Sequence, residues 1–204
     1  MSVSGALFDM VKLLDIGKTV ISKMTAEEVY EKAYTWAKEY DSELEEMLKA
    51  KEYSLKVFSI ERGTAKPRKD ISKWKEVKNA IIYMYDDKFE KLDLEYVDTK
   101  ITDKNEIAKI LKLYLEKYFD INHDKQTWFD KIKELAEEVD YAKEVKMYKQ
   151  EPEKWPGHVG DISTVIRVAL TGRTNTPDMY EIMQTLGEER TKQRIENAIK
   201  KMEE

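Results

Sequence analysis

The sequence predicts an all-α protein, and three observations support this prediction. Of the 204 residues, 38% are charged, and only 7 are Gly and 4 are Pro, so few positions interrupt a helix. Apolar residues recur at helical spacing through most of the chain. Capping residues stand where several of these apolar series begin, as they do at helix N-termini.

The composition excludes several other classes of protein. The 4 Trp and 12 Tyr argue against disorder, because these side chains carry large apolar surfaces for burial. The absence of cysteine excludes disulfides and thiolate metal sites and is typical of a reducing compartment. No apolar run approaches the roughly 20 residues that span a bilayer, and residues 1–15 lack the features of a signal peptide. We therefore expect a soluble, cytoplasmic protein with no membrane partner.

The first helix with clear signals begins at residue 25. Thr25 and Glu28 form a capping box, in which each side chain accepts a hydrogen bond from a backbone amide that the helix leaves unpaired. The apolar series after it comprises Val29, Ala33, Trp36, Ala37 and Tyr40. A second apolar series lies over residues 44–48. The run over residues 53–60 fits a strand or a helix by pattern alone, and the helical context favours a helix.

Residues 62–78 form a basic segment, with seven Lys or Arg against two Asp or Glu. Pro67 restricts the residue before it, so the segment begins as an irregular loop. Asp70 or Ser72 can cap the helix that follows. The buried side of that helix should comprise Trp74, Val77, Ile81 and Tyr85. Although the net charge is −5, a local basic patch can attract phosphates; the alternative is a solvated surface.

A polar connection over residues 86–105 separates two helical units, which we place at residues 1–95 and 96–204. Asp103 and Glu106 form a capping pair for the next helix. Apolar series at helical spacing then run over residues 107–118 and 128–139 and predict two helices.

Three short helices should complete the chain after the Pro- and Gly-containing segment 150–161. They are expected over residues 161–171, 177–186 and 188–202. Gly172 and Gly187 should end the first two of them. Thr176 should cap the second, with Pro177 in its first turn, where the missing N–H has no cost.

Two arginines stand out from their surroundings. Arg167 is the only charged residue from Ile162 to Thr171. It is either a surface arginine whose stem packs over apolar neighbours or a guanidinium fixed on a rigid helix to bind an anion or a base edge. Arg68 follows Pro67 in the basic segment. This stretch is either an ordinary basic loop or a stiffened one that follows a phosphate backbone and offers one arginine to a base.

Signatures of catalysis are missing from the sequence. The histidines, His123 and His158, both lie in turns without spaced partners, so neither is expected to bind a metal or act as a base. The chain has no phosphate-binding glycine loop and no nucleophile elbow. We therefore predict no catalytic residue, no metal and no cofactor in this chain.

Three stretches, taken in order, resemble the C-terminal anticodon-binding region of bacterial-type glutamyl-tRNA synthetases, which are class I aminoacyl-tRNA synthetases. They are SGALFDMVKLL at residues 4–14, KPRKD at residues 66–70 with the helix of Trp74 after it, and the long stretch from WPGHVGD to Ala198. The last match is the most specific. The resemblance implies an all-helical cage of two anticodon-binding subdomains, over residues 1–95 and 96–204, that grips the anticodon loop of glutamate tRNA.

The resemblance also implies roles for individual residues. Arg68 is expected to read the third anticodon base and Arg167 to contact the first, with Thr176 and Pro177 lying against that first base. Separately from the resemblance, the basic side chains of the chain supply the expected phosphate contacts, which are Lys66, Lys69, Lys73, Arg173, Arg190 and Arg194.

The family's catalytic domain, with the HIGH and KMSKS motifs that bind ATP and glutamate, has no counterpart in this sequence. We therefore expect a C-terminal fragment of a glutamate–tRNA ligase, a monomer that binds glutamate tRNA and is inactive alone. ATP would belong to the catalytic domain. The alternative is a stand-alone helical module that binds a protein partner and no tRNA.

Overall fold

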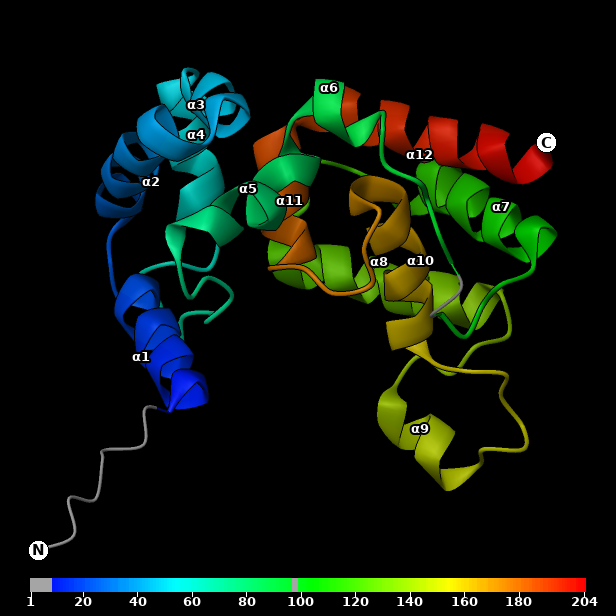
Figure 1. Ribbon diagram of the computed structural model, residues 1–204. Coiled ribbons are helices and arrows are strands. Elements are labelled where there is room, and N and C mark those ends of the chain that lie inside the picture. The colour runs from blue at the N-terminus through cyan, green and yellow to red at the C-terminus, as the bar shows by residue number, and fades with distance from the viewer. Residues whose placement is uncertain (1–8, 97–98) are drawn as a thin grey trace, which may run out of the picture. The chain divides into compact units, whose positions relative to one another are not determined.

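A computed structural model describes residues 9–96 and 99–204 and confirms the all-α prediction (Figure 1). These residues form helices and loops without a β-sheet, and their one isolated strand-like pair joins Ala142 and His158. None of the described helices is long and apolar enough to span a membrane. Residues 4–8 of the first matching stretch lie outside the described residues.

Contacts between the elements divide the chain into two compact units, Met1–Tyr85 and Asp86–Glu204, here named unit 1 and unit 2. The sequence prediction places the boundary after residue 95 instead. The difference has a physical reason, because the polar stretch after residue 85 contains Phe89 and Tyr96, which are both buried. Tyr96 packs in the core of unit 2, and its hydroxyl donates to the Val165 carbonyl at 3.4 Å.

The helices of the described part of unit 1 are α1 (Met10–Ser22), α2 (Ala26–Tyr40), α3 (Ser42–Leu48), α4 (Lys51–Ser59) and α5 (Val77–Ile81), with single 3₁₀ turns at η1 (Trp74–Glu76) and η2 (Ile82–Met84). Those of unit 2 are α6 (Asp86–Phe89), α7 (Lys104–Leu113), the π-helical turn η3 (Tyr114–Tyr118), α8 (Lys125–Glu138), α9 (Val145–Gln150), α10 (Val159–Thr171), α11 (Met179–Leu186) and α12 (Glu188–Glu203).

Unit 1 is built on α2, which packs against α3 and α4. The capping box at its start is confirmed, since the Thr25 amide donates to Glu28 Oε2 at 2.8 Å and the Glu28 amide to Thr25 Oγ1 at 3.2 Å. The segment 53–60 is helical for nearly its whole length, as predicted. α4 buries Ser54, Val57 and Phe58, whose spacing of three and four residues places them on one face of a helix. The buried residues of this core include Val29, Ala33, Ala37, Leu44, Leu48 and Phe58.

The single helix predicted after Asp70 or Ser72 is wrong. The chain instead forms η1, α5 and η2, and neither residue caps a helix. The Glu76 carboxylate accepts hydrogen bonds from both the amide and the hydroxyl of Ser72, each at 2.8 Å, which holds the chain in a tighter turn. The Met84 carbonyl at the other end accepts from the Tyr53 hydroxyl at 2.6 Å.

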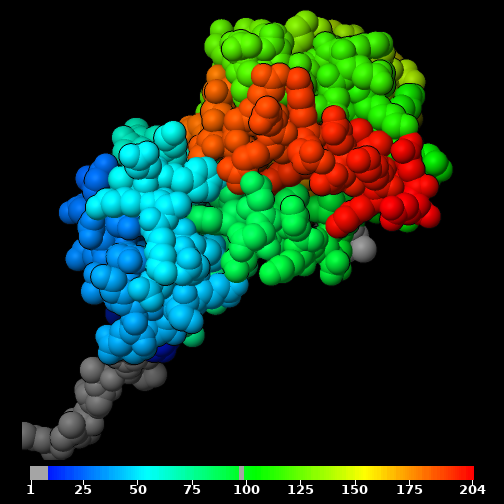
Figure 2. Space-filling model, turned by 90° about the horizontal axis from the view of Figure 1, so that it is seen from above, coloured from blue at the N-terminus to red at the C-terminus, as the bar shows by residue number. Residues whose placement is uncertain are grey.

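Unit 2 surrounds a core that α7, α8, α10 and α12 share. α12 packs lengthwise on α7, and α10 lies against both and against α8 (Figure 1). Figure 2 shows α12, in orange to red, at the surface of unit 2 beside the green segment that begins with α6. In the core, the Trp128 indole N–H donates to the Tyr114 hydroxyl at 3.0 Å. Such a bond satisfies two polar groups that would otherwise be unpaired in an apolar interior.

Candidate functional site

Arg167 lies near the end of α10, which is the most buried helix of unit 2. Its neighbours Ile166 and Val168 are fully buried, whereas Arg167 itself is half-buried at the edge of the helix. Arg167 Nη1 donates to Thr176 Oγ1 at 2.7 Å and to the carbonyls of Pro177 and Thr176 at 3.3 and 3.5 Å. The three residues that the resemblance assigned to one site are therefore joined directly, and the guanidinium is fixed by the turn after its own helix.

The turn that reaches Arg167 depends on a left-handed residue. Gly172 ends α10 as predicted, with φ 67° and ψ 18°, and its amide donates to the Val168 carbonyl at 2.8 Å. Only glycine adopts this conformation without a steric cost. The buried Thr171 hydroxyl donates to the Arg167 carbonyl at 2.7 Å and accepts from the Arg173 amide at 3.2 Å. These bonds direct residues 173–177 back along the helix.

Thr176 does not cap α11, so that prediction is wrong. The cap is Asp178, which accepts from the Glu181 amide at 3.0 Å, and α11 begins at Met179. The Thr176 hydroxyl is already engaged, because it accepts from Arg167 and donates to the Pro177 carbonyl at 2.9 Å. Thr176 is only 4% exposed. Its contribution to the site is therefore to hold Arg167, whereas Arg167 and Pro177 remain partly exposed.

Arg68 is held by a carboxylate in the loop of unit 1. Its Nε and Nη2 donate to the two Asp70 oxygens at 2.6 and 3.1 Å, and Glu61 Oε2 lies 3.9 Å from Nε. The hydrogen bond with Asp70 raises the pKa of the Arg68 guanidinium. A bidentate pair of this kind fixes the plane of the guanidinium as well as its position. Arg68 is thus an oriented side chain in an otherwise irregular loop.

The predicted phosphate contacts differ in their accessibility. Lys66 and Lys69 are exposed beside Arg68, and Lys73 is half-buried with Glu76 Oε1 at 3.7 Å. Arg173 is half-buried in the turn after α10. These four side chains lie at the surface of the two segments that carry Arg68 and Arg167.

Arg194 is a correction to the predicted phosphate contacts. It is only 3% exposed, its Nη1 donates to the Leu170 carbonyl and its Nη2 to Asp86 Oδ1, both at 2.7 Å. Its guanidinium also lies over the Phe89 ring, 3.9 Å from the centroid. A guanidinium this deeply buried, with two hydrogen bonds and a ring contact inside unit 2, is structural. The sequence misleads here because Arg194 lies on the same helix as the exposed Lys192, Lys200 and Lys201.

Arg190 shares Asp86 with Arg194. Arg190 Nη2 donates to Asp86 Oδ1 at 2.9 Å, and the half-buried side chain remains partly at the surface. Burial alone would raise the pKa of the Asp86 carboxyl, but the hydrogen bonds from Arg190 and Arg194 outweigh it and lower the pKa. This group of three residues, which we call the Asp86 cluster, joins the first residue of α6 to α12.

His158 has a structural role at the start of α10. His158 caps α10, because its Nδ1 accepts from the Gly160 amide at 3.0 Å while Asp161 Oδ2 accepts from the His158 amide at 2.8 Å. The described residues contain no group of three or more side chains suited to hold a metal ion. The roles of Asp70, Thr171 and Asp86 were not predicted from the sequence. Only Asp70 had a signal, since it stands two positions after Arg68.

Comparisons with known proteins place these features in a class. Residues 156–199, which contain α10, α11 and most of α12, match the family described as anticodon binding domain. The Arg167 site lies inside this match, and the resemblance predicted from the motifs is confirmed.

The particular relatives are glutamate–tRNA ligases. The chain is 47% identical to the glutamate–tRNA ligase of Clostridium perfringens strain 13 over 197 residues. This match covers 96% of this chain and 36% of the relative. The chain is 46% identical over 200 residues to the glutamate–tRNA ligase of Acetivibrio thermocellus, and this match covers 98% of this chain and 36% of the relative. The enzyme of Sorangium cellulosum is 39% identical over 94% of this chain and 33% of its own length. The chain thus spans about a third of the length of the curated relatives it matches.

Proposed function

We propose that this chain recognises a tRNA anticodon as part of a glutamate–tRNA ligase. The observation that carries the proposal is the fixed guanidinium of Arg167, held by Thr176 and Pro177 inside the segment that matches anticodon binding domains. An arginine held on a rigid helix loses little entropy on binding, and its fork suits the edge of an unpaired base. Arg167 is the contact to the first anticodon base, with Pro177 beside it.

Arg68 is the second base contact, to the third anticodon position. The pair with Asp70 fixes the plane of its guanidinium, which supports selection between bases over simple charge attraction. Lys66, Lys69, Lys73 and Arg173 contact phosphates, which position the anticodon loop without reading sequence.

The whole ligase joins glutamate to its tRNA with ATP, and the ATP site belongs to the remaining two-thirds of the enzyme. This chain supplies recognition and no catalytic group. It acts in the cytoplasm, as a monomer, on glutamate tRNA.

The test is binding of the chain to glutamate tRNA and to transcripts that differ from it only in the first anticodon base. Arg167→Ala should abolish the preference for the correct base, a loss of roughly 1–3 kcal/mol or 5- to 150-fold. Arg167→Lys keeps the positive charge but removes the planar guanidinium with its paired N–H donors. This variant should therefore keep most of the affinity for tRNA and lose most of the preference for the correct base.

Thermal unfolding is the control, because Arg167 is at the helix edge and its replacement should leave the fold intact. If the chain binds no tRNA but forms a salt-insensitive complex with a protein, it is a helical interaction module and the proposal fails. If Arg167→Ala binds all transcripts as the wild type does, another residue reads the base.

A further inference from the structure

The helix that carries Arg167 ends in the buried interior of unit 2. An α-helix leaves its last four carbonyls without a partner inside the helix. In α10 these belong to residues 168–171, and all four residues are fully buried. The Leu170 carbonyl accepts a hydrogen bond from another helix, because Arg194 Nη1 of α12 donates to it at 2.7 Å. Without this donor, a buried carbonyl at the end of α10 would lose its hydrogen bond.

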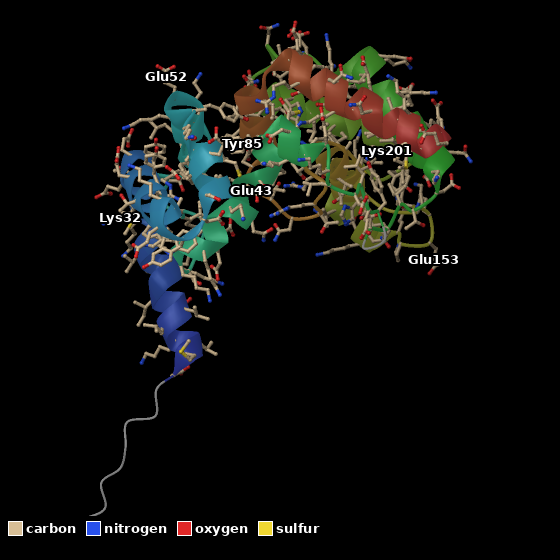
Figure 3. All side chains as sticks on the ribbon, turned by 45° about the horizontal axis from the view of Figure 1, so that its top comes forward. Lys32, Glu43, Glu52, Tyr85, Glu153 and Lys201 are labelled. Carbon is tan, nitrogen blue, oxygen red and sulfur yellow. The ribbon has the colours of Figure 1, made fainter. Side chains whose placement is uncertain are left out.

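Arg194 is well suited to the end of a helix. A positive charge is favourable there, since the backbone dipoles place a partial negative charge at a helix C-terminus. Two residues of α6 hold the guanidinium, because Nη2 donates to Asp86 Oδ1 at 2.7 Å and the Phe89 ring centroid lies 3.9 Å from Cζ. In Figure 3, α12 is the orange-to-red helix that carries the labelled Lys201. Asp86 and Phe89 therefore set the position of the group that bonds to α10.

The chain after α6 also contacts the turn that follows α10, residues 172–177. A Cβ on Gly172 would lie 3.5 Å from the Asp93 carbonyl oxygen and 3.7 Å from Leu92 Cβ, so both residues lie against the start of this turn. Leu92 is half-buried. The end of α10 is thus supported by Arg194, and the turn after it by Leu92 and Asp93.

The end of α10 and this turn together determine the orientation of Arg167. The Thr171 hydroxyl joins them, because it donates to the Arg167 carbonyl at 2.7 Å and accepts from the Arg173 amide at 3.2 Å. Further along the turn, Thr176 Oγ1 accepts from Arg167 Nη1 at 2.7 Å. A shift of the turn relative to α10 would therefore move the acceptor that fixes the guanidinium.

We propose that Arg194 is a positioning residue for recognition of the first anticodon base. It fixes the last turn of α10 and, together with Leu92, keeps the turn 172–177 where Thr176 can hold Arg167. The inference rests on the proposed function, which makes Arg167 the contact to that base. Because Arg194 is only 3% exposed, it acts through α10 and not by touching RNA.

A positioning residue and a purely structural residue differ in what their loss changes. Loss of a structural residue lowers the unfolding temperature, but the molecules that remain folded keep the wild-type site. Loss of a positioning residue changes the site in folded molecules. Measurements of the site well below the unfolding temperature of each variant separate the two roles.

The first measurement needs no RNA. Arg194→Met removes the cation and its hydrogen bonds to α10 and α6. The Gly172 and Arg173 amides are hydrogen-bonded in the wild type, to the Val168 carbonyl and to Thr171 Oγ1. Their hydrogen exchange in the variant should rise at least about tenfold, because the turn opens more easily without its support.

Arg190→Met is the matched control for hydrogen exchange. Arg190 lies one turn earlier on α12 and also donates to Asp86, at 2.9 Å. Its replacement removes the same charge from the Asp86 cluster but keeps the bond from Arg194 to Leu170. Exchange of the two turn amides should therefore stay at the wild-type rate.

The second measurement is binding to tRNA transcripts with altered anticodons. Arg194→Met should lower the preference for the correct first base about fivefold, the effect of one hydrogen bond, and leave the preference at the third base unchanged. Arg194→Lys should restore part of the first-base preference, because an ammonium group can still donate to the Leu170 carbonyl but lacks the planar guanidinium.

Leu92→Ala tests the same support if Arg194→Met does not fold. This substitution keeps the Asp86 cluster and removes a side chain that lies against Gly172. It should raise exchange of the Gly172 amide and lower the preference at the first base. Leu94→Ala is its matched control, because Leu94 is also half-buried in this segment and packs on the core of unit 2. The control should change neither quantity.

A double variant tests whether Arg194 acts through the turn. Thr176→Val removes the acceptor for Arg167 directly. If Arg194 positions that acceptor, the losses of first-base preference in Arg194→Met and Thr176→Val have one cause, and the double variant should lose little more than either single variant. Losses that multiply in the double variant would overturn the proposal, because Arg194 would then act by another route.

The two measurements separate this inference from the proposed function. If the wild type prefers the correct first base and Arg194→Met keeps that preference, the inference fails and the proposed function stands, whether or not exchange changes. If the wild type shows no base preference but the turn amides exchange faster in Arg194→Met, only the assignment of anticodon recognition fails. Arg194 then still positions the turn that holds Arg167.

Discussion

At the scale of single residues, the site depends on a hydroxyl that faces inward. Thr176 bonds to Arg167 and to the Pro177 carbonyl while almost fully buried. Because the Thr176 hydroxyl is uncharged and almost fully buried, it orients the Arg167 guanidinium without neutralising its charge. Arg167 therefore keeps its attraction for a base or a phosphate. Arg68 has the opposite arrangement, because Asp70 both orients and partly neutralises it.

Thr176→Val should therefore separate orientation from charge. The substitution keeps the shape of the side chain and removes the acceptor, so Arg167 should lose its fixed position. We expect discrimination at the first anticodon base to fall by about 1 kcal/mol, roughly fivefold, with a similar loss of stability. Binding to transcripts with each base, together with urea unfolding, measures both quantities.

Thr185→Val is the matched control for this prediction. The Thr185 hydroxyl donates to the Glu181 carbonyl at 2.8 Å within α11 and has no hydrogen bond to Arg167. It should lower stability slightly and leave discrimination intact. If Thr176→Val preferred the correct first anticodon base as strongly as Thr185→Val does, the Thr176 hydroxyl would not position Arg167.

The family resemblance implied which residues gather at this site, but not how they are arranged. Arg167 was conspicuous as a lone charge in an apolar helix, and Gly172 marked the turn. The role of Thr176 was not predictable from spacing, because a threonine before a helix can cap it or bond to a distant guanidinium. Asp178 caps α11 instead, because it lies two residues nearer to the start of that helix.

At the scale of elements, the Asp86 cluster joins α6 to α12. Burial opposes ionisation of Asp86, but Arg190 and Arg194 hold the pKa of its carboxyl below the ordinary value. A depressed carboxyl pKa contributes stability that is present above the unfolded pKa, near 4, and is lost as the pH falls through the folded value.

Asp86→Asn should thus destabilise unit 2 at neutral pH, and the loss should shrink progressively as the pH falls below about 4. Because 48% of the Asp86 side chain is exposed, solvent screening limits the expected loss to about 1–2 kcal/mol. Urea unfolding of both proteins from pH 7 to pH 3 measures the difference. Asp87→Asn, at an exposed neighbour, is the control. A difference that does not shrink on acidification would assign the effect to packing and not to charge.

Periodicity predicted most of the elements, and the failures have physical causes. Strong apolar stripes gave α2, α7, α8 and α10 with boundaries within a few residues. The region after Asp70 was predicted as one helix because its apolar spacing is helical. Within that segment the Glu76 carboxylate bonds back to Ser72, and the Met84 carbonyl at its end accepts from Tyr53, 31 positions away. The chain forms short turns there, and a bond to a residue so distant leaves no mark on periodicity.

At the scale of the whole molecule, charge separation matters more than the net charge of −5. Exposed lysines surround Arg68 in one unit, whereas the Arg167 site in the other relies on a few partly buried groups. We expect the affinity for tRNA to fall steeply with salt, because each neutralised phosphate releases counterions.

Lys69→Ala should reduce the slope of log affinity against log salt by about one while leaving base preference unchanged. Lys131→Ala is the control, because Lys131 is paired with Glu134 at 2.6 Å on α8 and is not among the expected phosphate contacts. Titrations at four salt concentrations with the correct and an altered anticodon measure slope and preference together. Identical slopes for the wild type and Lys69→Ala would remove Lys69 from the interface.

The Asp86 cluster also sets an order for biosynthesis. Asp86 and Arg194 are separated by 108 positions, and α12 supplies the surface on which α7 packs. Contacts between such distant positions form late, because the intervening chain must first be closed into a loop. Unit 2 therefore cannot finish folding on the ribosome before α12 has emerged. Until then, the apolar sides of α7 and α10 are exposed to chaperones and to neighbouring nascent chains.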